Sequence, residues 1–380
     1  MSAIELALWA GLAASVVAYS LSLVALNRIR RPWTRAMPLP ALSPPVSILK
    51  PLCGTDDELE ENLESFFRLD YPSYEVVFSF TGREDPAYPV TRRVADRHPA
   101  VPSTFVFDPR EPGGNAKVNR LGAAQRHARH RLLWLADGNV RVRPDCLSRA
   151  VARFADPRVG LVSHLFRARG AVTVGSRLES LHLNGCLLPG TAAIAEWLRM
   201  PCVVGKSILI SRDALDAIGG FGRLRDFLAE DYLLGREIRR AGYRVVLFGD
   251  VIETSEARRG LSAVWSRQRR WAVMRRRLAG PLYAGELLTG AAPWCAALMF
   301  VSSPSGRAAA LALLALRYAV ELWDADRSGA AVRVRDWALL PVRDAGALLL
   351  FVAGLTGRAV SWRGRALRVG RQTAIRPVNV

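Results

Sequence analysis

The sequence predicts an α/β protein in which a mostly parallel sheet carries helices on both faces and transmembrane helices stand at both ends of the chain. Between residues 44 and 249, short apolar runs alternate with helical patterns. Such alternation is typical of a parallel sheet covered by helices on both faces. Long apolar segments that could enter a bilayer occur only before residue 27 and after residue 284.

The N-terminal apolar segment is expected to be a membrane anchor. Residues 3–26 are apolar apart from one acid and a few hydroxyl groups, and they are long enough to cross about 30 Å of hydrocarbon. A cleaved signal peptide would carry positive charge before the apolar run. Here the positive charge follows it, at Arg28, Arg30, Arg31 and Arg35. The positive-inside rule therefore predicts a cytoplasmic domain after the anchor.

Three apolar segments follow near the C-terminus, at residues 285–303, 308–323 and 337–355. The first two predict a hairpin of spans with a short outside turn. The third contains Arg343 and Asp344, and each charge costs about 2.5–3.5 kcal/mol in a span unless it is paired. Because the arginine-rich tail favours the cytoplasm, a re-entrant or interfacial third segment is slightly preferred over a third span.

The middle of the chain contains the predicted sheet. Apolar runs predict strands at residues 46–52, 74–80, 103–108 and 131–137, and residues 56–69 open on acids and repeat apolar side chains as a helix would. In sheets of this kind, ligands bind beyond the carboxyl ends of the strands. Asp137 stands at such an end, so the sequence predicts a carboxylate at the mouth of a ligand crevice.

Asp137 is followed by Gly138 and Asn139, which allow a sharp turn and offer a second oxygen ligand. A carboxylate would repel a phosphorylated ligand unless a cation stood between them. Mg²⁺ and Mn²⁺ favour carboxylate oxygen together with phosphate oxygen. The alternative is an ordinary solvated turn, because Asp, Gly and Asn are also typical turn residues.

Two further segments predict contacts in the same crevice. Asp85 follows the second predicted strand, although an ordinary Asp-Pro loop explains it equally well. Residues 108–120 contain Gly113, Gly114 and Lys117, which suit a phosphate, but they lack the spacing of a nucleotide-triphosphate loop.

An acidic pair begins another predicted helix, within residues 227–245. Glu230 and Asp231 lie among apolar side chains, so one acid should be partly buried at the helix N-terminus. Partial burial raises the pKa of a carboxyl group and makes it a usable base. The equally weighted alternative is that the acids only stabilise the helix N-terminus through its dipole.

A basic segment, residues 264–277, precedes the C-terminal apolar region. Arg267 and Trp271 share a helical face, with Arg270 beside them, and Arg267 falls in the apolar half of the helix. Arginines held beside an indole suit a diphosphate. The alternative is a helix that touches lipid headgroups, but such a helix would keep its apolar half free of charge.

The net charge of +19, from 53 basic and 34 acidic residues, creates a positive field around the protein. This field suits nucleic acid, anionic lipid and phosphorylated substrates equally, so charge does not select among them. The five cysteines show no paired spacing, which argues against a zinc cluster or a disulfide framework.

Eight segments between Val46 and Leu278 resemble the ceramide glucosyltransferases, membrane-bound inverting glycosyltransferases with a nucleotide-diphospho-sugar transferase fold. They are VSILKPLCG, ENLESFFRLDYPSYEVVFSF, EDPA, NAKVNRL, ADGNVRV, GKSILISRDALDAIGGF, LAEDYLLG and RQRRW. Bacterial hopanoid glycosyltransferases are similar over the same segments, so the motifs identify the superfamily better than the acceptor. The resemblance implies a GT-A-like fold.

The resemblance also implies roles for the acids. Asp85 matches the first family aspartate, near the nucleotide, and Asp137 matches the second, beside the metal and the diphosphate. Asp231 matches the third aspartate, the catalytic base. Related enzymes often have a further acid where Asn139 stands. The implied cofactor is Mn²⁺ or Mg²⁺ at Asp137 and Asn139, and the missing acid puts the metal requirement in doubt.

The resemblance implies donor contacts for five basic or aromatic residues. Arg267, Arg270 and Trp271 match the [QR]-x-x-R-W motif of the family, which closes over the diphosphate and the acceptor. Lys50 and Lys117 are expected to contact the nucleotide-sugar donor.

The expected domain boundaries follow from these segments. Residues 1–30 form the anchor, 43–255 the cytoplasmic catalytic domain, 256–281 an interfacial basic helix region, and 282–380 the C-terminal membrane region with its basic tail. Acceptor choice is expected to reside in residues 175–202.

The expected reaction is transfer of a hexose, with UDP-glucose as the expected donor, to a lipid hydroxyl, foremost that of ceramide, with inversion at the anomeric carbon. The alternatives are a hopanoid N-acetylglucosaminyltransferase or another lipid glycosyltransferase. A processive polysaccharide synthase would need more spans, and a nucleic-acid binder would not need Asp231, so no nucleic-acid partner is expected. The expected location is the bacterial inner membrane, with the catalytic domain in the cytoplasm.

Overall fold

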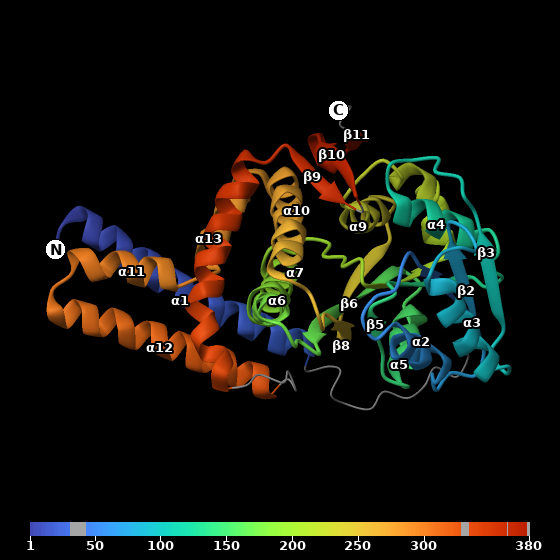
Figure 1. Cartoon of the computed structure of the whole chain (residues 1–380), viewed down its shortest axis with the longest axis horizontal. Helices are drawn as coiled ribbons and strands as arrows, with labels where there is room; N and C mark the ends of the chain where they lie inside the picture. The colour runs from blue at the N-terminus through green and yellow to red at the C-terminus, as the bar shows by residue number, and fades with distance from the viewer. Residues whose placement is uncertain (31–42, 328–333, 363, 378–380) are drawn as a thin grey trace.

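The computed structural model describes residues 1–30, 43–327, 334–362 and 364–377. Arg31 and Arg35, which contribute to the predicted orientation of the anchor, lie outside these ranges. Figure 1 shows the sheet and its helices at one end of the molecule and long helices at the other, with further helices standing between them.

Within the described residues, eight strands form one sheet in the order β3-β2-β1-β4-β7-β6-β8-β5. They are β1 Val46–Pro51, β2 Tyr74–Phe80, β3 Ser103–Phe107, β4 Leu132–Ala136, β5 Val140–Arg141, β6 Val159–Arg169, β7 Ser207–Ser211 and β8 Arg244–Ser255. β7 is antiparallel to β4 and β6, β5 is antiparallel to β8, and the other pairs are parallel. The mostly parallel sheet is confirmed, and the four predicted strands agree to within one residue at each end.

Helices cover both faces of the sheet because its buried strands point successive side chains to opposite sides. On β1, Ile48 packs into one hydrophobic core and Leu49 into the other. The first core also contains residues of α2 Leu59–Phe67, α3 Ala87–Arg97 and α5 Cys146–Val151. The second contains residues of α4 Ala116–Gln125, α8 Arg212–Ala217 and α9 Glu230–Arg240. The predicted helix at 56–69 is shorter than expected, since Glu58 takes a left-handed conformation just before α2 begins.

Further helices follow the two long strands β6 and β8. After β6, α6 Val174–His182 continues through a π-helical turn, η3 Leu183–Leu187, into α7 Leu188–Trp197. After β8, α10 Leu261–Ala279 continues into η5 Gly280–Leu288, and α10 contacts α6. Short 3-10 turns occur at η2 Ala152–Ala155 and η4 Phe221–Leu224.

The chain ends supply the long helices of Figure 1: α1 Ala3–Arg30, α11 Ala292–Val301, α12 Pro304–Arg327 and, after η6 Val334–Leu339, α13 Leu340–Thr356. Among the described residues, two helical segments, Ala3–Arg30 and Asp336–Thr356, are long and apolar enough to cross a membrane. A third candidate arises if the pair Leu261–Leu288 and Ala292–Val301, bent by 56°, is counted as one span.

The predicted hairpin is present as α11 and α12, which meet at the turn after Val301. Its first arm has 10 residues, which span only about 15 Å, half the thickness of the hydrocarbon. Residues of α1, α11 and α12 share one hydrophobic cluster, and Figure 1 shows α13 running across the direction of these three helices. The charges of α13 are paired: Arg343 contacts Asp344 and also Glu321 of α12. This pairing lowers the cost of burying the charges in a span, and η6 together with α13, Asp336–Thr356, is long and apolar enough to cross a membrane. The interfacial third segment therefore stays a prediction.

The basic tail folds back onto the sheet domain. Strands β9 Ala359–Trp362, β10 Arg365–Val369 and β11 Ile375–Pro377, with the turn η7 Arg371–Thr373, form a small antiparallel sheet. Val360, Leu367 and Ile375 pack with Leu228, just before α9, and with Val273 of α10. The tail therefore lies on the same side of the molecule as the central sheet.

Candidate functional site

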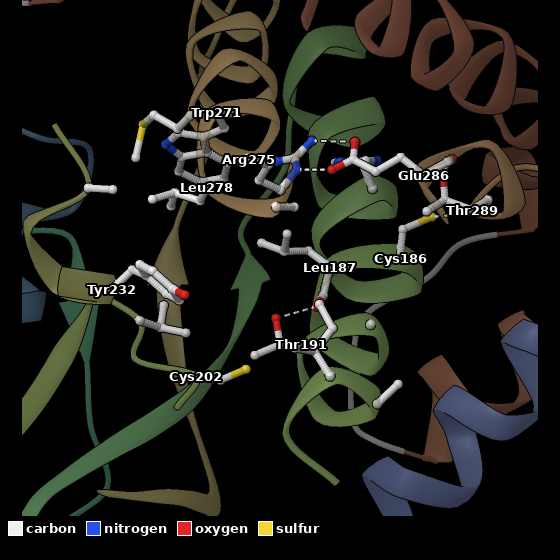
Figure 2. A pocket seen from close by; sticks show the side chains of 18 of the residues that line it. Cys186, Leu187, Thr191, Cys202, Tyr232, Trp271, Arg275, Leu278, Glu286 and Thr289 are labelled. Atoms are coloured by element: carbon white, nitrogen blue, oxygen red, sulfur yellow. Dashed lines mark hydrogen bonds and ion pairs between the residues drawn. The ribbon is translucent and has the colours of Figure 1, made fainter. Parts of the chain in front are cut away.

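A cavity of about 690 Å³ lies where the carboxyl end of β4 faces α7, α9 and α10. Figure 2 shows Tyr232 of α9 and Leu187 and Thr191 of the η3–α7 segment facing across it, with Trp271 and Leu278 of α10 above. The part that we call the charged end is lined by Lys117, Asp137, Lys206, Glu230 and Asp231. The remainder, which we call the apolar end, is lined mostly by apolar residues of α1, α7, α10, η5 and α13.

Asp137 reaches the charged end because it directly follows the buried strand β4. Its Oδ1 lies 2.8 Å from Nζ of Lys117, and its Oδ2 lies 3.4 Å from Nζ of Lys206. Burial alone would raise the pKa of Asp137, but the two ammonium groups outweigh it and hold the pKa at about 2. Asp137 is therefore a carboxylate at neutral pH, and both of its oxygens face ammonium groups.

Lys117 and Lys206 come from different elements. Asn115 caps α4 by accepting hydrogen bonds from the backbone N–H groups of Lys117 and Val118, which fixes Lys117 in the first helical turn. Lys206 precedes β7, and its backbone carbonyl accepts a 3.2 Å hydrogen bond from the N–H of Asp137 because β7 runs antiparallel to β4. Both lysine side chains are therefore directed to Asp137 by backbone geometry.

Asn139 does not present a free oxygen to a metal. Its Oδ1 accepts a 2.8 Å hydrogen bond from Lys206, and its Nδ2 donates to Glu256. In the described part of the chain, no three His, Cys, Asp or Glu side chains gather so as to hold a metal ion. A divalent ion at Asp137 would have to displace at least one ammonium group. As arranged, Asp137 and Asn139 do not fit the Mn²⁺ or Mg²⁺ ion that the sequence suggests.

Asp231 lies in the first turn of α9, as predicted, and faces the cavity. Its Oδ2 accepts a 2.8 Å hydrogen bond from the N–H of Gly205, and its Oδ1 accepts one from the N–H of Tyr232. Burial raises the pKa of Asp231. A carboxylate that is partly buried, fixed by two backbone donors and open to a cavity can accept a proton from a bound hydroxyl group.

Glu230 is the neighbour of Asp231 on the same turn. Its Oε2 accepts a hydrogen bond from Nδ2 of Asn115, and its Oε1 lies 3.5 Å from Nζ of Lys117. Burial raises the pKa of Glu230 to about 7, in spite of the nearby Lys117 and with a further increase from Asp231. The protonation state of each acid therefore shifts the pKa of the other.

The predicted pairing of Arg267 with Trp271 is present, with the guanidinium 5.0 Å from the centre of the indole ring. Arg267 is only 7% exposed, and it donates to Glu179 and Glu256 at 2.8 and 3.0 Å. Its Nη2 lacks a hydrogen-bond partner within the described ranges, and the residue lines the cavity. Arg270 also lines the cavity and lies over Trp362 of the tail. The arginines thus line the site, and Arg267 has one buried nitrogen without a partner among the described residues.

Asp85 and Lys50 are at the same edge of the sheet but do not line the cavity. Asp85 Oδ1 accepts hydrogen bonds from the N–H groups of Gly54 and Ala87, so it ties the loop after β1 to the start of α3. Lys50 is fully buried, and its Nζ donates a 2.8 Å hydrogen bond to the backbone carbonyl of Asp137. Burial lowers the pKa of Lys50 to about 7.

Sequence reasoning missed Lys206, Glu179, Glu256 and Thr373. The run SILIS after Lys206 is apolar enough to predict a strand, but only an antiparallel neighbour of β4 would place Lys206 beside Asp137. Thr373 holds the segment before α9, because its carbonyl accepts from the N–H of Leu228 and its Oγ1 from the N–H of Ala229. No local pattern predicts that contact between the tail and α9.

The apolar end contains one ion pair within its walls. Arg275 of α10 and Glu286 of η5 form two contacts, drawn as dashed lines in Figure 2, near Cys186 and Thr289. Gly190 of α7 also lines this end, and no side chain or backbone atom lies within 4 Å of where its Cβ would be. The apolar end therefore has room for a long apolar group with a polar contact along its length.

The sequence profile of glycosyl transferase family 21 matches residues 7–375. The chain is 29% identical over 233 residues to ceramide glucosyltransferase 1 of Caenorhabditis elegans, covering 61% of this chain and 50% of that one. It is 22% identical over 360 residues to the ceramide glucosyltransferase of Pyricularia oryzae, covering 76% of this chain and 72% of that one. The chain thus spans about half the length of the nematode relative.

A similar solved structure is a mannosyltransferase from Pyrobaculum calidifontis in complex with GDP-Man and Mn²⁺. Its TM-score is 0.56 at 22% sequence identity, and the match covers 90% of this chain and 97% of that one. This likeness confirms the GT-A-like fold.

Proposed function

Because the chain belongs to glycosyl transferase family 21, we propose that it transfers a hexose from a UDP-sugar to a hydroxyl group of a membrane lipid. UDP-glucose is the proposed donor and ceramide the proposed acceptor. The observation that carries this proposal is a single cavity in which Asp231 and the ion cluster of Asp137 line one part and apolar residues from both ends of the chain line the rest.

In the proposed mechanism, Asp231 removes the proton of the lipid hydroxyl as its oxygen attacks the anomeric carbon. The bond from that carbon to the diphosphate breaks on the opposite face, so the configuration inverts, and the electron pair leaves with UDP. The guanidinium of Arg267, a residue that lines the cavity, adds positive charge beside the diphosphate. Fixed positive groups at a leaving diphosphate lower the barrier because they need no reorganisation during the reaction.

Lys50 and Asp85 have supporting roles in this proposal. Lys50 fixes the backbone of Asp137 by donating a hydrogen bond to its carbonyl oxygen. Asp85 accepts a hydrogen bond from Gly54 and so orders the loop after β1, on the proposed nucleotide side of the crevice. Asp137 orients the ammonium groups of Lys117 and Lys206.

The apolar end supports a lipid acceptor. Ala18 of α1, Ile194 of α7, Leu282 of η5 and Leu350 of α13 line it, and α1 and α13 include the candidate membrane spans. An acceptor with its hydroxyl at Asp231 would keep its apolar chain among these helices. We propose that the catalytic domain faces the cytoplasm of a bacterial inner membrane, where UDP-sugars are available.

A hopanoid N-acetylglucosaminyltransferase is the second candidate, since the sequence motifs resemble both groups of enzymes. The discriminating experiment uses purified full-length protein in detergent with UDP-glucose or UDP-N-acetylglucosamine, each offered with ceramide and with a hopanoid lipid. We expect a glucosylceramide mass and, by NMR, the anomeric configuration opposite to that of the donor. Transfer only to the hopanoid lipid would replace the acceptor in the proposal, and absence of transfer to either lipid from either donor would overturn it.

A further inference from the structure

The chain contains few lysines, and all of them contact the same residue. Only three of the 53 basic residues are lysines, namely Lys50, Lys117 and Lys206. All three contact Asp137: Lys50 donates to its backbone carbonyl at 2.8 Å, Lys117 lies 2.8 Å from Oδ1, and Lys206 lies 3.4 Å from Oδ2. All other basic residues of the chain are arginines, whereas the surroundings of Asp137 hold three compact ammonium groups from three separate segments.

The chemistry of the two side chains explains why lysine suits this position. Arginine spreads its charge over a planar fork, whereas lysine carries a compact point charge with three donors. Two of the donors on Lys206 serve Asn139 and Asp137, and two on Lys117 serve Asp137 and the carbonyl of Gly205. Lys206 therefore keeps one donor for a further acceptor, whereas the third donor of Lys117 faces Oε1 of Glu230 at 3.5 Å. Both residues line the cavity.

The same contacts leave little place for a metal ion. Both carboxylate oxygens of Asp137 face ammonium groups, and the oxygen of Asn139 is bonded to Lys206. A divalent cation here would be repelled by two positive charges and would have to separate them from the carboxylate. A phosphate group, in contrast, would meet the free donor of Lys206, the positive charge of both lysines and a compensated carboxylate.

We infer that Lys117 and Lys206, held in place by Asp137, carry the positive charge that stabilises the departing diphosphate, so that sugar transfer needs no divalent metal ion. The inference rests on the proposed function. When the bond between the anomeric carbon and the phosphate oxygen breaks, the electron pair stays on the diphosphate, which the two ammonium groups contact. The lipid oxygen forms the new bond, and its proton passes to Asp231.

The first test measures UDP binding to the purified full-length protein by titration calorimetry, in EDTA and in Mn²⁺. Sugar transfer to the lipid acceptor is measured in the same two solutions. We expect the UDP dissociation constant and the transfer rate to differ less than about threefold between them, because the lysines already supply the charge.

The second test is the variant Lys206→Met, which keeps the length of the side chain and removes its charge. In EDTA it should bind UDP roughly 10- to 100-fold more weakly, the loss typical of a hydrogen bond to a charged group. The matched control is Arg131→Met, because Arg131 pairs with Asp213 on the exposed surface. This control should bind UDP as the wild type does, and thermal melting would show whether each variant is folded.

The outcomes separate the inference from the proposed function. If UDP binding and transfer both require Mn²⁺, the inference is wrong and the proposed function stands. If folded Lys206→Met binds UDP in EDTA as tightly as the wild type, the inference is also wrong. If the wild type transfers no sugar in either solution, the proposed function is wrong and the inference falls with it.

Discussion

The two ends of the cavity are built in different ways. At the charged end, Lys117 lies in the first turn of α4, Asp137 follows β4 and Lys206 precedes β7. Each of their charged groups has a partner within hydrogen-bond distance. At the apolar end, the walls come from segments as far apart as Ala18 of α1 and Ala347 of α13. The Lys117, Asp137 and Lys206 cluster thus comes from the sheet domain alone, whereas the walls of the apolar end need segments from both ends of the chain.

The largest effect is expected at the charged end, from Asp231→Asn. This variant keeps the shape of the side chain but cannot accept the proton of the acceptor, so transfer should fall by roughly 10²–10⁴-fold. UDP binding should change little, because the asparagine oxygen can still accept the N–H of Gly205. Rates from mass spectrometry and UDP titration measure the two properties. The control is Asp213→Asn on the exposed surface, and near-normal transfer by folded Asp231→Asn would contradict the base assignment.

A smaller decrease in transfer is expected at the apolar end. Gly190→Phe would place a ring in the open space of the cavity, so transfer to a long-chain lipid should fall roughly 10-fold or more while UDP binding stays unchanged. Gly190→Ala is the matched control, since its single methyl group meets no atom within 4 Å. Equal transfer rates for the two variants would show that the acceptor does not occupy this part of the cavity.

A smaller effect is expected in the pH dependence of transfer. Because burial raises the pKa of Asp231 and raises that of Glu230 to about 7, the pair holds a proton well above the usual range of carboxyl groups. The base acts when deprotonated, so the rate should rise with pH through the neutral range. Glu230→Gln removes the neighbouring charge and should move this rise to lower pH. A pH profile of kcat/KM checks the shift, and an unchanged profile would mean that Glu230 does not influence the base.

The smallest effect is expected from Thr373 of the tail, which does not line the cavity. Thr373→Val removes the acceptor of the Ala229 N–H and leaves that buried donor without a partner. The cost should be about 1–3 kcal/mol of local stability, with a few-fold decrease in kcat because α9 is less firmly held. Thr373→Ser keeps the hydroxyl group and should retain both properties. A kcat equal to that of the wild type in the valine variant would show that the tail does not position α9.

Local patterns predict the parts of the site that one segment determines alone. The apolar run of β4 predicts that Asp137 follows a buried strand, and the apolar residues that recur at helical spacing after Asp231 predict that it lies in the first turn of α9. The contact of Arg267 with Trp271 follows from the spacing of four residues along α10.

The remaining parts depend on contacts between distant segments. Lys206 reaches Asp137 only because β7 runs antiparallel to β4, whereas strand and helix alternation predicts parallel neighbours. Glu179 and Glu256, which neutralise Arg267, come from α6 and from the residue after β8, and nothing in α10 predicts them. The pairing of Arg343 with Glu321 likewise decides how α13 packs against α12.

The position of the apolar end beside α1 and α13 also affects how acceptor kinetics are measured. A lipid that enters between such helices arrives by lateral diffusion within its leaflet and does not pass through water. The relevant quantity is then the mole fraction of acceptor in the micelle or vesicle rather than its bulk molarity. At a constant amount of lipid, added detergent lowers the mole fraction of acceptor in each micelle. Transfer should therefore become slower, even though the bulk concentrations of all components remain saturating.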